Sequence, residues 1–267
     1  SSDLDMNRHF SKEDIKKYYK YAIYSGRSEL KTEIANSHLS WLWWILDPLL
    51  FMLVYTFVAL VVFGKGEKYF PIYVFIGLSA WKFFEKTVKQ SVTLVSGNRG
   101  IVLKVYLPKY QLILVKMYAN GFKMMVSFAL VAVMLLIYRV PLSYRVIYFI
   151  PLLVVLALFT FGASCILLHF GVFVEDLSNV INVLLKLVFY MTGIFYSLAK
   201  RVPSPYNMVL LKCNPIAFII DEMRKCILYE TTPDFMILGI WFVISLILSA
   251  IGIKLIYQYE NSYVKII

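Results

Sequence analysis

The run WLWWILDPLLFMLVYTFVALVVF (41–63) contains one charged residue, Asp47, and is long enough to cross a lipid bilayer as a helix. About 20 apolar residues span the roughly 30 Å of hydrocarbon in a membrane. The whole chain agrees: 60% of its 267 residues are hydrophobic, 16% are charged, and the mean hydropathy is +0.72. These values exclude an ordinary soluble domain and intrinsic disorder, because both need a more polar chain. The sequence predicts a polytopic membrane protein.

Further apolar runs bring the expected number of crossings to six, in an all-α fold. An N-terminal cytoplasmic segment (1–40) precedes one transmembrane domain (41–267), whose expected spans are 41–63, 69–84, 110–138, 146–174, 177–199 and 235–257. An even number of crossings places both termini on one side of the membrane.

Basic residues indicate which side that is. The first 40 residues carry seven Lys or Arg and the connection 82–109 carries six, against two in each short connection after the first and third spans. This bias favours cytoplasmic termini in the inner (cytoplasmic) membrane. The five basic residues between 200 and 234 oppose it, but that connection is longer and partly apolar. The net charge of +11 is explained by such loops, so no nucleic acid partner is expected.

Two connecting segments are predicted to be amphipathic helices. Ser11 and Asp14 form a helix start signal, and apolar residues recur at helical spacing up to Ile34 with basic residues on the other face. We expect this helix to lie in the cytoplasmic interface, or alternatively to pack on a soluble partner or on the chain itself. The second helix is expected to continue from span two, because Val88, Val92 and Val95 share a face; the alternative is a plain loop.

The segment 201–228 carries Pro203, Pro205 and Pro215, yet it also contains apolar stretches. It has too many prolines to span a membrane and too many apolar residues for a free loop. We expect helices that dip partway back into the membrane and are covered by protein.

No motif for catalysis or metal binding is present. The sequence lacks G-x-x-x-x-G-K-[ST], H-E-x-x-H and G-x-S-x-G, and His9, His38 and His169 are scattered. We therefore expect no enzyme activity and no cofactor in this chain, so that any pumping takes its energy from a gradient or a partner. A disulfide between Cys213 and Cys226 is an alternative to two free thiols, and no sequence pattern supports it.

Charged and aromatic residues in the spans are candidates for a substrate path. Lys123 is expected close to the middle of span three, and Lys186 lies in span five; such residues are costly in lipid and commonly functional. Lysine would suit an anionic substrate, and aromatic rings would suit sugars. The alternatives are lysine side chains that reach the interface and rings that only pack. The aromatic candidates are Phe189 and Tyr196 in span five and Trp44, Phe51 and Tyr55 in span one.

Three segments together resemble the permeases of type 2 ABC exporters, in particular the branch that carries O-antigen, capsular polysaccharide or teichoic acid. They are RSELKTEIANSHLSWLWWILDPLLFMLVYTFVALVVFG (27–64), SGNRGIVLKVYLPK (96–109) and NPIAFIIDEMRK (214–225). They occur in the family's order and cover nearly the whole chain. Ser40 stands where the family usually has glycine, and TEIAN (32–36) replaces a more basic stretch. Both departures bear on the choice of substrate branch within the family and not on the resemblance to the family itself.

The resemblance implies a homodimer of six-span subunits, each docked on a separate ATPase chain that binds ATP and Mg. It implies an interface helix at about Ser11–Asn36, a coupling helix at about Glu85–Val95, and a path lined by spans one and five. The residues expected to meet the ATPase are Glu85, Lys89, Asn98, Arg99 and Lys104. The expected cargo is a lipid-linked or long-chain surface polysaccharide, and the polymer itself is not identified. Alternatives are export of a drug or small lipid, a gradient-driven secondary transporter, or a membrane anchor for a synthase.

Overall fold

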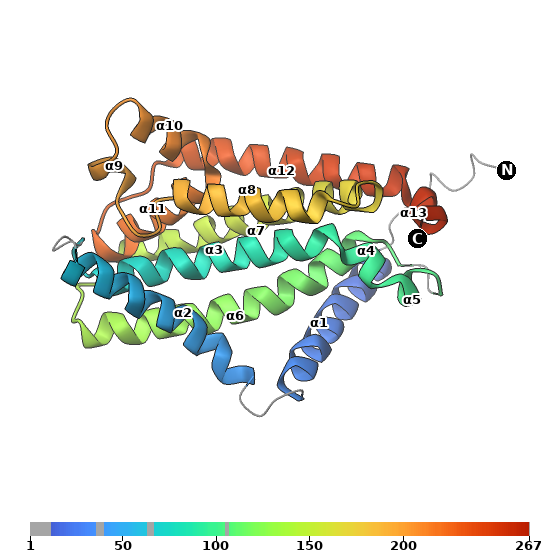
Figure 1. Cartoon of the computed structure of the whole chain (residues 1–267), viewed down its shortest axis with the longest axis horizontal. Helices are drawn as coiled ribbons and strands as arrows, with labels where there is room; N and C mark the ends of the chain where they lie inside the picture. The colour runs from blue at the N-terminus through green and yellow to red at the C-terminus, as the bar shows by residue number, and fades with distance from the viewer. Residues whose placement is uncertain (1–11, 36–39, 63–66, 105–106, 267) are drawn as a thin grey trace.

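The computed structural model describes residues 12–35, 40–62, 67–104 and 107–266, and every regular element in these ranges is helical (Figure 1). This confirms the predicted all-α membrane class. Of the residues named above, Ser11, Asn36, Phe63, His9 and His38 lie outside the described ranges. The elements are α1 (Lys12–Ala35), α2 (Ser40–Phe57), η1 (Val58–Val62), α3 (Phe70–Val92), α4 (Leu94–Gly97), α5 (Arg99–Val102), α6 (Tyr110–Ile137), η2 (Tyr144–Tyr148), α7 (Phe149–Phe173), α8 (Leu177–Met191), α9 (Leu198–Arg201), α10 (Tyr206–Cys213), α11 (Pro215–Leu228), α12 (Phe235–Gln258) and α13 (Glu260–Ile266).

Four of the described helices are long and apolar enough to cross a membrane: 41–61, 110–137, 144–173 and 235–258. They correspond to expected spans one, three, four and six. Helix α3 has 23 residues but carries charged side chains along one face. Helix α8 has 15 residues, or roughly 22 Å at 1.5 Å per residue, which is less than the hydrocarbon thickness.

Helix α3 is the central element of the bundle and lies between α6 and α7. Most of its side chains are buried, including Trp81 at 2% exposure. It runs without interruption to Val92, so span two continues directly into the segment expected to be the coupling helix, beyond the span limit expected at Phe84. The helix breaks at Thr93, before the expected end at Val95, and the short helices α4 and α5 follow at one end of the bundle (Figure 1).

Helices α7 and α12 pack closely because small residues face each other. A Cβ added to Gly162 would lie 2.8 Å from the backbone nitrogen of Ser249, and one added to Gly252 would lie 2.5 Å from Cβ of Cys165. The Ser249 hydroxyl also donates to the carbonyl of Leu158 at 3.2 Å. Small residues that let backbones approach are the usual means of helix association in lipid.

The expected fifth span ends at Met191 rather than Ala199. Gly193 has φ +66°, a left-handed conformation that stops the helix. The carbonyls of Gly193 and Ile194 then accept hydrogen bonds from the Arg224 guanidinium of α11, at 2.9 and 2.7 Å. Apolar content alone gave no sign of this turn, because Ile194 and Phe195 are as apolar as the helix before them.

The proline-rich segment forms α9, α10 and α11, at the end of the bundle opposite α4 and α5 (Figure 1). Asn214 caps α11, because its side-chain oxygen accepts from the backbone N–H groups of Ile216 and Ala217. Helix α11 is largely buried against α3 and α7, whereas no residue of α10 is buried. Cys213 and Cys226 are free thiols on these two helices, so no disulfide joins them.

Helix α1 lies along the first half of α6, and the two helices approach closely at Gly26, where an added Cβ would lie 2.5 Å from the Tyr118 ring. Its polar face carries Glu29, which pairs with Lys116 of α6 at 2.5 Å. Tyr24 on another face is 77% exposed. The expected interface helix therefore packs on the chain itself along one side and keeps a second side free.

Candidate functional site

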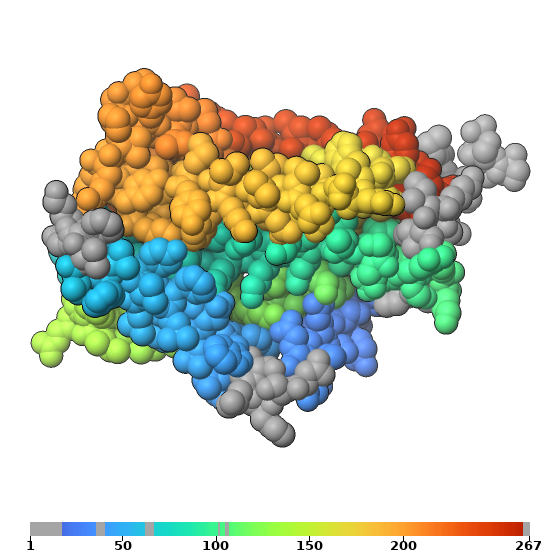
Figure 2. Space-filling view, viewed as in Figure 1, coloured from blue at the N-terminus to red at the C-terminus, as the bar shows by residue number. Residues whose placement is uncertain are grey.

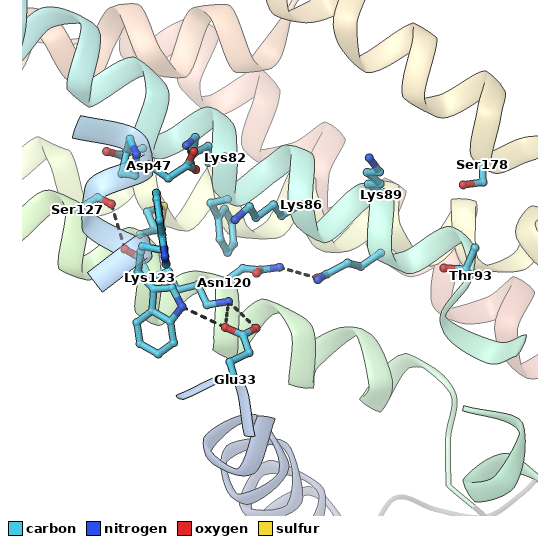
Figure 3. A pocket seen from close by; sticks show the side chains of 17 residues that line it. Glu33, Asp47, Lys82, Lys86, Lys89, Thr93, Asn120, Lys123, Ser127 and Ser178 are labelled. Atoms are coloured by element: carbon cyan, nitrogen blue, oxygen red, sulfur yellow. Dashed lines mark hydrogen bonds and ion pairs between the residues drawn. The ribbon is translucent and has the colours of Figure 1, made fainter. Parts of the chain in front are cut away.

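A cavity of about 830 Å³ lies between the end of α1, the start of α2, α3 and α6. Figure 2 shows the surface hollowed between the blue α2 and the teal α3, and Figure 3 shows the cavity from close by. Its polar and charged lining residues are Glu33, Asp47, Ser79, Lys82, Lys86, Lys89, Gln90, Thr93, Asn120, Lys123, Ser127 and Ser178.

One wall of the cavity is a face of α3. Lys82, Lys86, Lys89 and Thr93 follow one another at i, i+4, i+7 and i+11, which places them on the same side of a helix (Figure 3). The other faces of α3 are packed in the core, so this side is the one left for charged residues. The wall is therefore strongly basic.

The facing wall belongs to α6, which presents Asn120, Lys123 and Ser127. The Asn120 amide is 4% exposed and donates to Oγ1 of Thr87 at 3.1 Å and to Oε1 of Gln90 at 2.9 Å. These hydrogen bonds join α3 and α6 beside the cavity. They connect the two polar walls of the cavity in this conformation.

Charges that interrupt the apolar spans pair with each other at this site. Lys123 contacts Glu33 of α1 at 2.6 Å and lies 5.3 Å from the centre of the Trp44 ring. Trp44 Nε1 donates to the same carboxylate at 3.1 Å. Lys82 forms an ion pair with Asp47 of α2. The charge of Lys123 thus has a carboxylate partner on the amphipathic α1.

The remaining two lysines of α3 have no such partner among the described residues. Lys86 and Lys89 are exposed in the cavity wall, and neither forms an ion pair with any described residue. The cavity contains four lysines and two carboxylates, so it has an excess of two positive charges. A group with negative charge would be attracted to this wall.

Several expected path residues meet outside the cavity, between α2 and the end of α8. The rings of Tyr55 and Phe195 stack with centroids 3.4 Å apart, and Phe195 lies 5.3 Å from Phe189. Phe51 is 6.4 Å from Tyr55, and Lys82 Nζ lies 5.1 Å from the Phe51 ring. Phe195, which sequence reasoning did not single out, links the aromatic candidates of the two helices.

The other two expected path residues lie apart from this group. Lys186 is exposed on α8, and it makes no ion pair with a described residue. The Tyr196 hydroxyl donates to the carbonyl of Tyr190 at 2.7 Å, which closes the turn after α8. The expected path residues thus fall into three places. Trp44 and Lys123 line the cavity, the rings of Phe51, Tyr55 and Phe189 gather between α2 and α8, and Lys186 and Tyr196 lie outside both groups.

The residues expected to meet an ATPase also fall into two groups. Glu85 accepts a hydrogen bond from Trp81 Nε1 at 3.0 Å within α3, and Lys89 lines the cavity. Asn98, by contrast, follows α4 and donates from Nδ2 to the carbonyl of Leu94 at 2.7 Å.

Arg99 and Lys104 lie with Asn98 at the end of the bundle, and both are exposed. Of the five residues expected to meet an ATPase, only these three share one surface. Glu85 and Lys89 lie further from that end, within the long helix α3, because α3 runs without a break to Val92.

Sequence reasoning missed Lys86 as a member of the site and missed Glu33 as the partner of Lys123. The spacing of Lys82, Lys86 and Lys89 was a usable signal for a basic helix face. The partner of Lys123 lies 90 positions earlier, so no local pattern reveals it.

No group of three or more His, Cys, Asp and Glu that could hold a metal is found among the residues the structure describes. His169 instead contacts the Tyr263 hydroxyl through Nδ1 at 2.8 Å and joins α7 to α13. The histidine therefore has a packing role in this arrangement.

A bundle with four apolar helices long enough to cross a membrane defines a polytopic membrane protein. The chain is 24% identical over 240 residues to the O-antigen export system permease protein RfbA of Klebsiella pneumoniae, covering 90% of this chain and 92% of that protein. It is 28% identical to RfbA of Myxococcus xanthus over 224 residues, covering 82% and 86%. It is 21% identical to the polysialic acid transport protein KpsM of Escherichia coli over 232 residues, covering 85% and 88%. No family model matches the chain. Its curated homologues are thus type 2 ABC exporter permeases at modest identity over most of the chain, which confirms the predicted resemblance.

Proposed function

We propose that the chain is the permease subunit of an ATP-driven exporter that moves a lipid-linked or long-chain surface polysaccharide across the cytoplasmic membrane. The similarity to O-antigen export and polysialic acid transport proteins over most of the chain carries this proposal. The cavity supports it, because its basic wall suits the acidic groups of a polysaccharide and the exposed Trp43 ring at its edge offers an aromatic face to sugars. Export of a drug or small lipid is the nearest alternative.

The proposal includes a separate ATPase chain that binds ATP and Mg, and a second copy of the permease. The lack of a phosphate-loop motif in this sequence supports a separate ATPase. The outer face of α8 leaves Val183, Leu184 and Leu187 exposed, which supports burial against lipid or another subunit.

We place the ATPase at the end of the bundle that carries α4 and α5. Arg99 and Lys104 are exposed there, and the same end carries the start of α1 and α13 (Figure 1). Basic residues favour the cytoplasmic side. In this orientation both termini are cytoplasmic.

Helix α3 gives a direct route from that end to the cavity. It ends at Val92, next to α4, and its lysine face lines the cavity. A push on α4 and α5 when the ATPase closes would therefore shift the basic wall relative to α6. The two states of this movement must differ in their affinity for the cargo.

The test is to delete the gene and measure surface polysaccharide by extraction and immunoblotting, with the wild-type chain as complement. The proposal predicts loss of surface polymer on deletion and also on inactivation of the phosphate-loop lysine in the partner ATPase. The double variant Asn98→Ala/Arg99→Ala should retain ATP hydrolysis and lose export, whereas Lys212→Ala, an exposed lysine on α10, should export normally. Export that survives loss of the ATPase and stops with an ionophore would identify a secondary transporter instead.

A further inference from the structure

We infer that the cavity between α1, α2, α3 and α6 binds a phosphate-bearing group through Lys86 and Lys89. The physiological source of this group rests on the proposed function, in which it belongs to the cargo or its lipid carrier. The binding site itself is argued from the charges and shape of the cavity alone.

The first argument is the charge balance. Lys82 and Lys123 already have carboxylate partners in Asp47 and Glu33. Lys86 and Lys89 are exposed in the same wall and form no ion pair with a described residue. The cavity beside them has space for an anionic ligand. Two like charges at i and i+3 on a helix repel each other, so a shared anion would stabilise this face.

The second argument concerns the kind of anion. Lys86 and Lys89 are three residues apart on one face, so their flexible side chains can reach one ligand together. A phosphate monoester carries a charge of about −1.5 to −2 near neutral pH and three acceptor oxygens, whereas a carboxylate carries one charge. An excess of two positive charges therefore matches phosphate better than a single carboxylate. The hydroxyls of Thr93 and Ser178 line the same end of the cavity as Lys89 and offer neutral donors (Figure 3).

The third argument is the surrounding surface. The cavity of about 830 Å³ is within the usual range for a small-molecule site. Trp43, 56% exposed, lies at its edge, and Leu50, Leu53 and Val54 continue an exposed apolar face along α2. An amphiphile can therefore place its phosphate at the lysines while its apolar chain lies against α2. A free phosphate would use only the lysines.

The experiment measures binding of radiolabelled decyl phosphate to the purified full-length chain in phosphatidylcholine nanodiscs, with empty nanodiscs subtracted. The matched variants are Lys86→Gln/Lys89→Gln and, as a control with the same loss of charge, Lys212→Gln/Lys254→Gln, two exposed lysines outside the cavity. We expect saturable binding that the first variant weakens by about tenfold or more and the control leaves unchanged. Binding should also weaken with rising salt.

Further arms identify the ligand. Uncharged decyl β-glucoside should not compete; competition equal to that of decyl phosphate would overturn the inference. Inorganic phosphate that binds as tightly as decyl phosphate supports a site for phosphate alone, whereas weaker binding supports the head group of an amphiphile. Equal decyl phosphate affinity in the Lys86→Gln/Lys89→Gln variant and the wild type would also overturn the inference. Because none of these measurements requires transport, they can fail while polysaccharide export in the deletion test succeeds, and the reverse also holds.

Discussion

Arg224 should be one of the residues on which the stability of the bundle depends most. Its guanidinium is 2% exposed and donates to three backbone carbonyls, those of Tyr73 at 3.0 Å, Gly193 at 2.9 Å and Ile194 at 2.7 Å. It also lies over the Tyr73 ring, with Cζ 3.6 Å from the centroid. One side chain thus joins α11, α3 and the turn after α8.

The conservative variant Arg224→Lys keeps the charge but loses the planar arrangement of donors. An ammonium on a shorter reach can satisfy about one of the three carbonyls, so two charge-assisted hydrogen bonds are lost. At about 1.5–3 kcal/mol each, the expected destabilisation is about 3–6 kcal/mol. The assay is the free energy of unfolding in mixed detergent–SDS micelles, and the matched control is Arg201→Lys, an exposed arginine on α9, which should change by less than about 0.5 kcal/mol.

Gly77 provides an internal check on this reasoning. A Cβ added there would lie 2.4 Å from one Arg224 nitrogen, so Gly77→Ala should displace the guanidinium and cost stability through the same contacts. The double variant Gly77→Ala/Arg224→Lys should then be less destabilised than the sum of the single variants. An Arg224→Lys protein as stable as the wild type, or fully additive effects, would refute the argument.

Three further predictions concern other contacts. Gly252→Ala should destabilise the α7–α12 pair by about 1–3 kcal/mol in the same unfolding assay, whereas Gly239→Ala on the same helix, where an added Cβ meets nothing within 4 Å, should not; equal effects would contradict the close packing. Glu260→Gln removes the ion pair to Lys109 at 2.6 Å and should speed hydrogen exchange and proteolysis in α13; unchanged protection would mean that the pair does not hold this helix. Lys123→Met should leave the carboxylate of α1 without its cation and loosen α1 from α6, seen as faster exchange in α1; a rate equal to the wild type would contradict this role.

The sequence predicted the long apolar helices well, because a stretch of about 20 apolar residues has one stable arrangement in lipid. The first and last expected spans begin within a residue or so of α2 and α12. Prediction failed where the helix limits depend on contacts. The turn after Met191 requires a left-handed glycine and a buried arginine from α11, and neither is visible in local hydropathy.

For the cavity, too, local spacing could be predicted from the sequence and long-range contacts could not. Its lysine face on α3 follows helical spacing and could be predicted from the sequence, although the pattern was read there as part of a coupling helix. Which lysines are neutralised could not be predicted, since Asp47 lies 35 positions from Lys82 and Glu33 lies 90 positions from Lys123. Only the fold shows that Lys86 and Lys89 form no ion pair with any residue that the structure describes.

Reconstitution tests the central claim, that this chain moves its cargo with energy from a partner, most directly. The purified permease is placed in sealed proteoliposomes with and without the ATPase chain proposed as its partner, and the transfer of lipid-linked polysaccharide is followed by accessibility to an added glycosidase. Our account predicts transfer only when the ATPase and ATP with Mg are both present. Sustained transfer by the permease alone would contradict it.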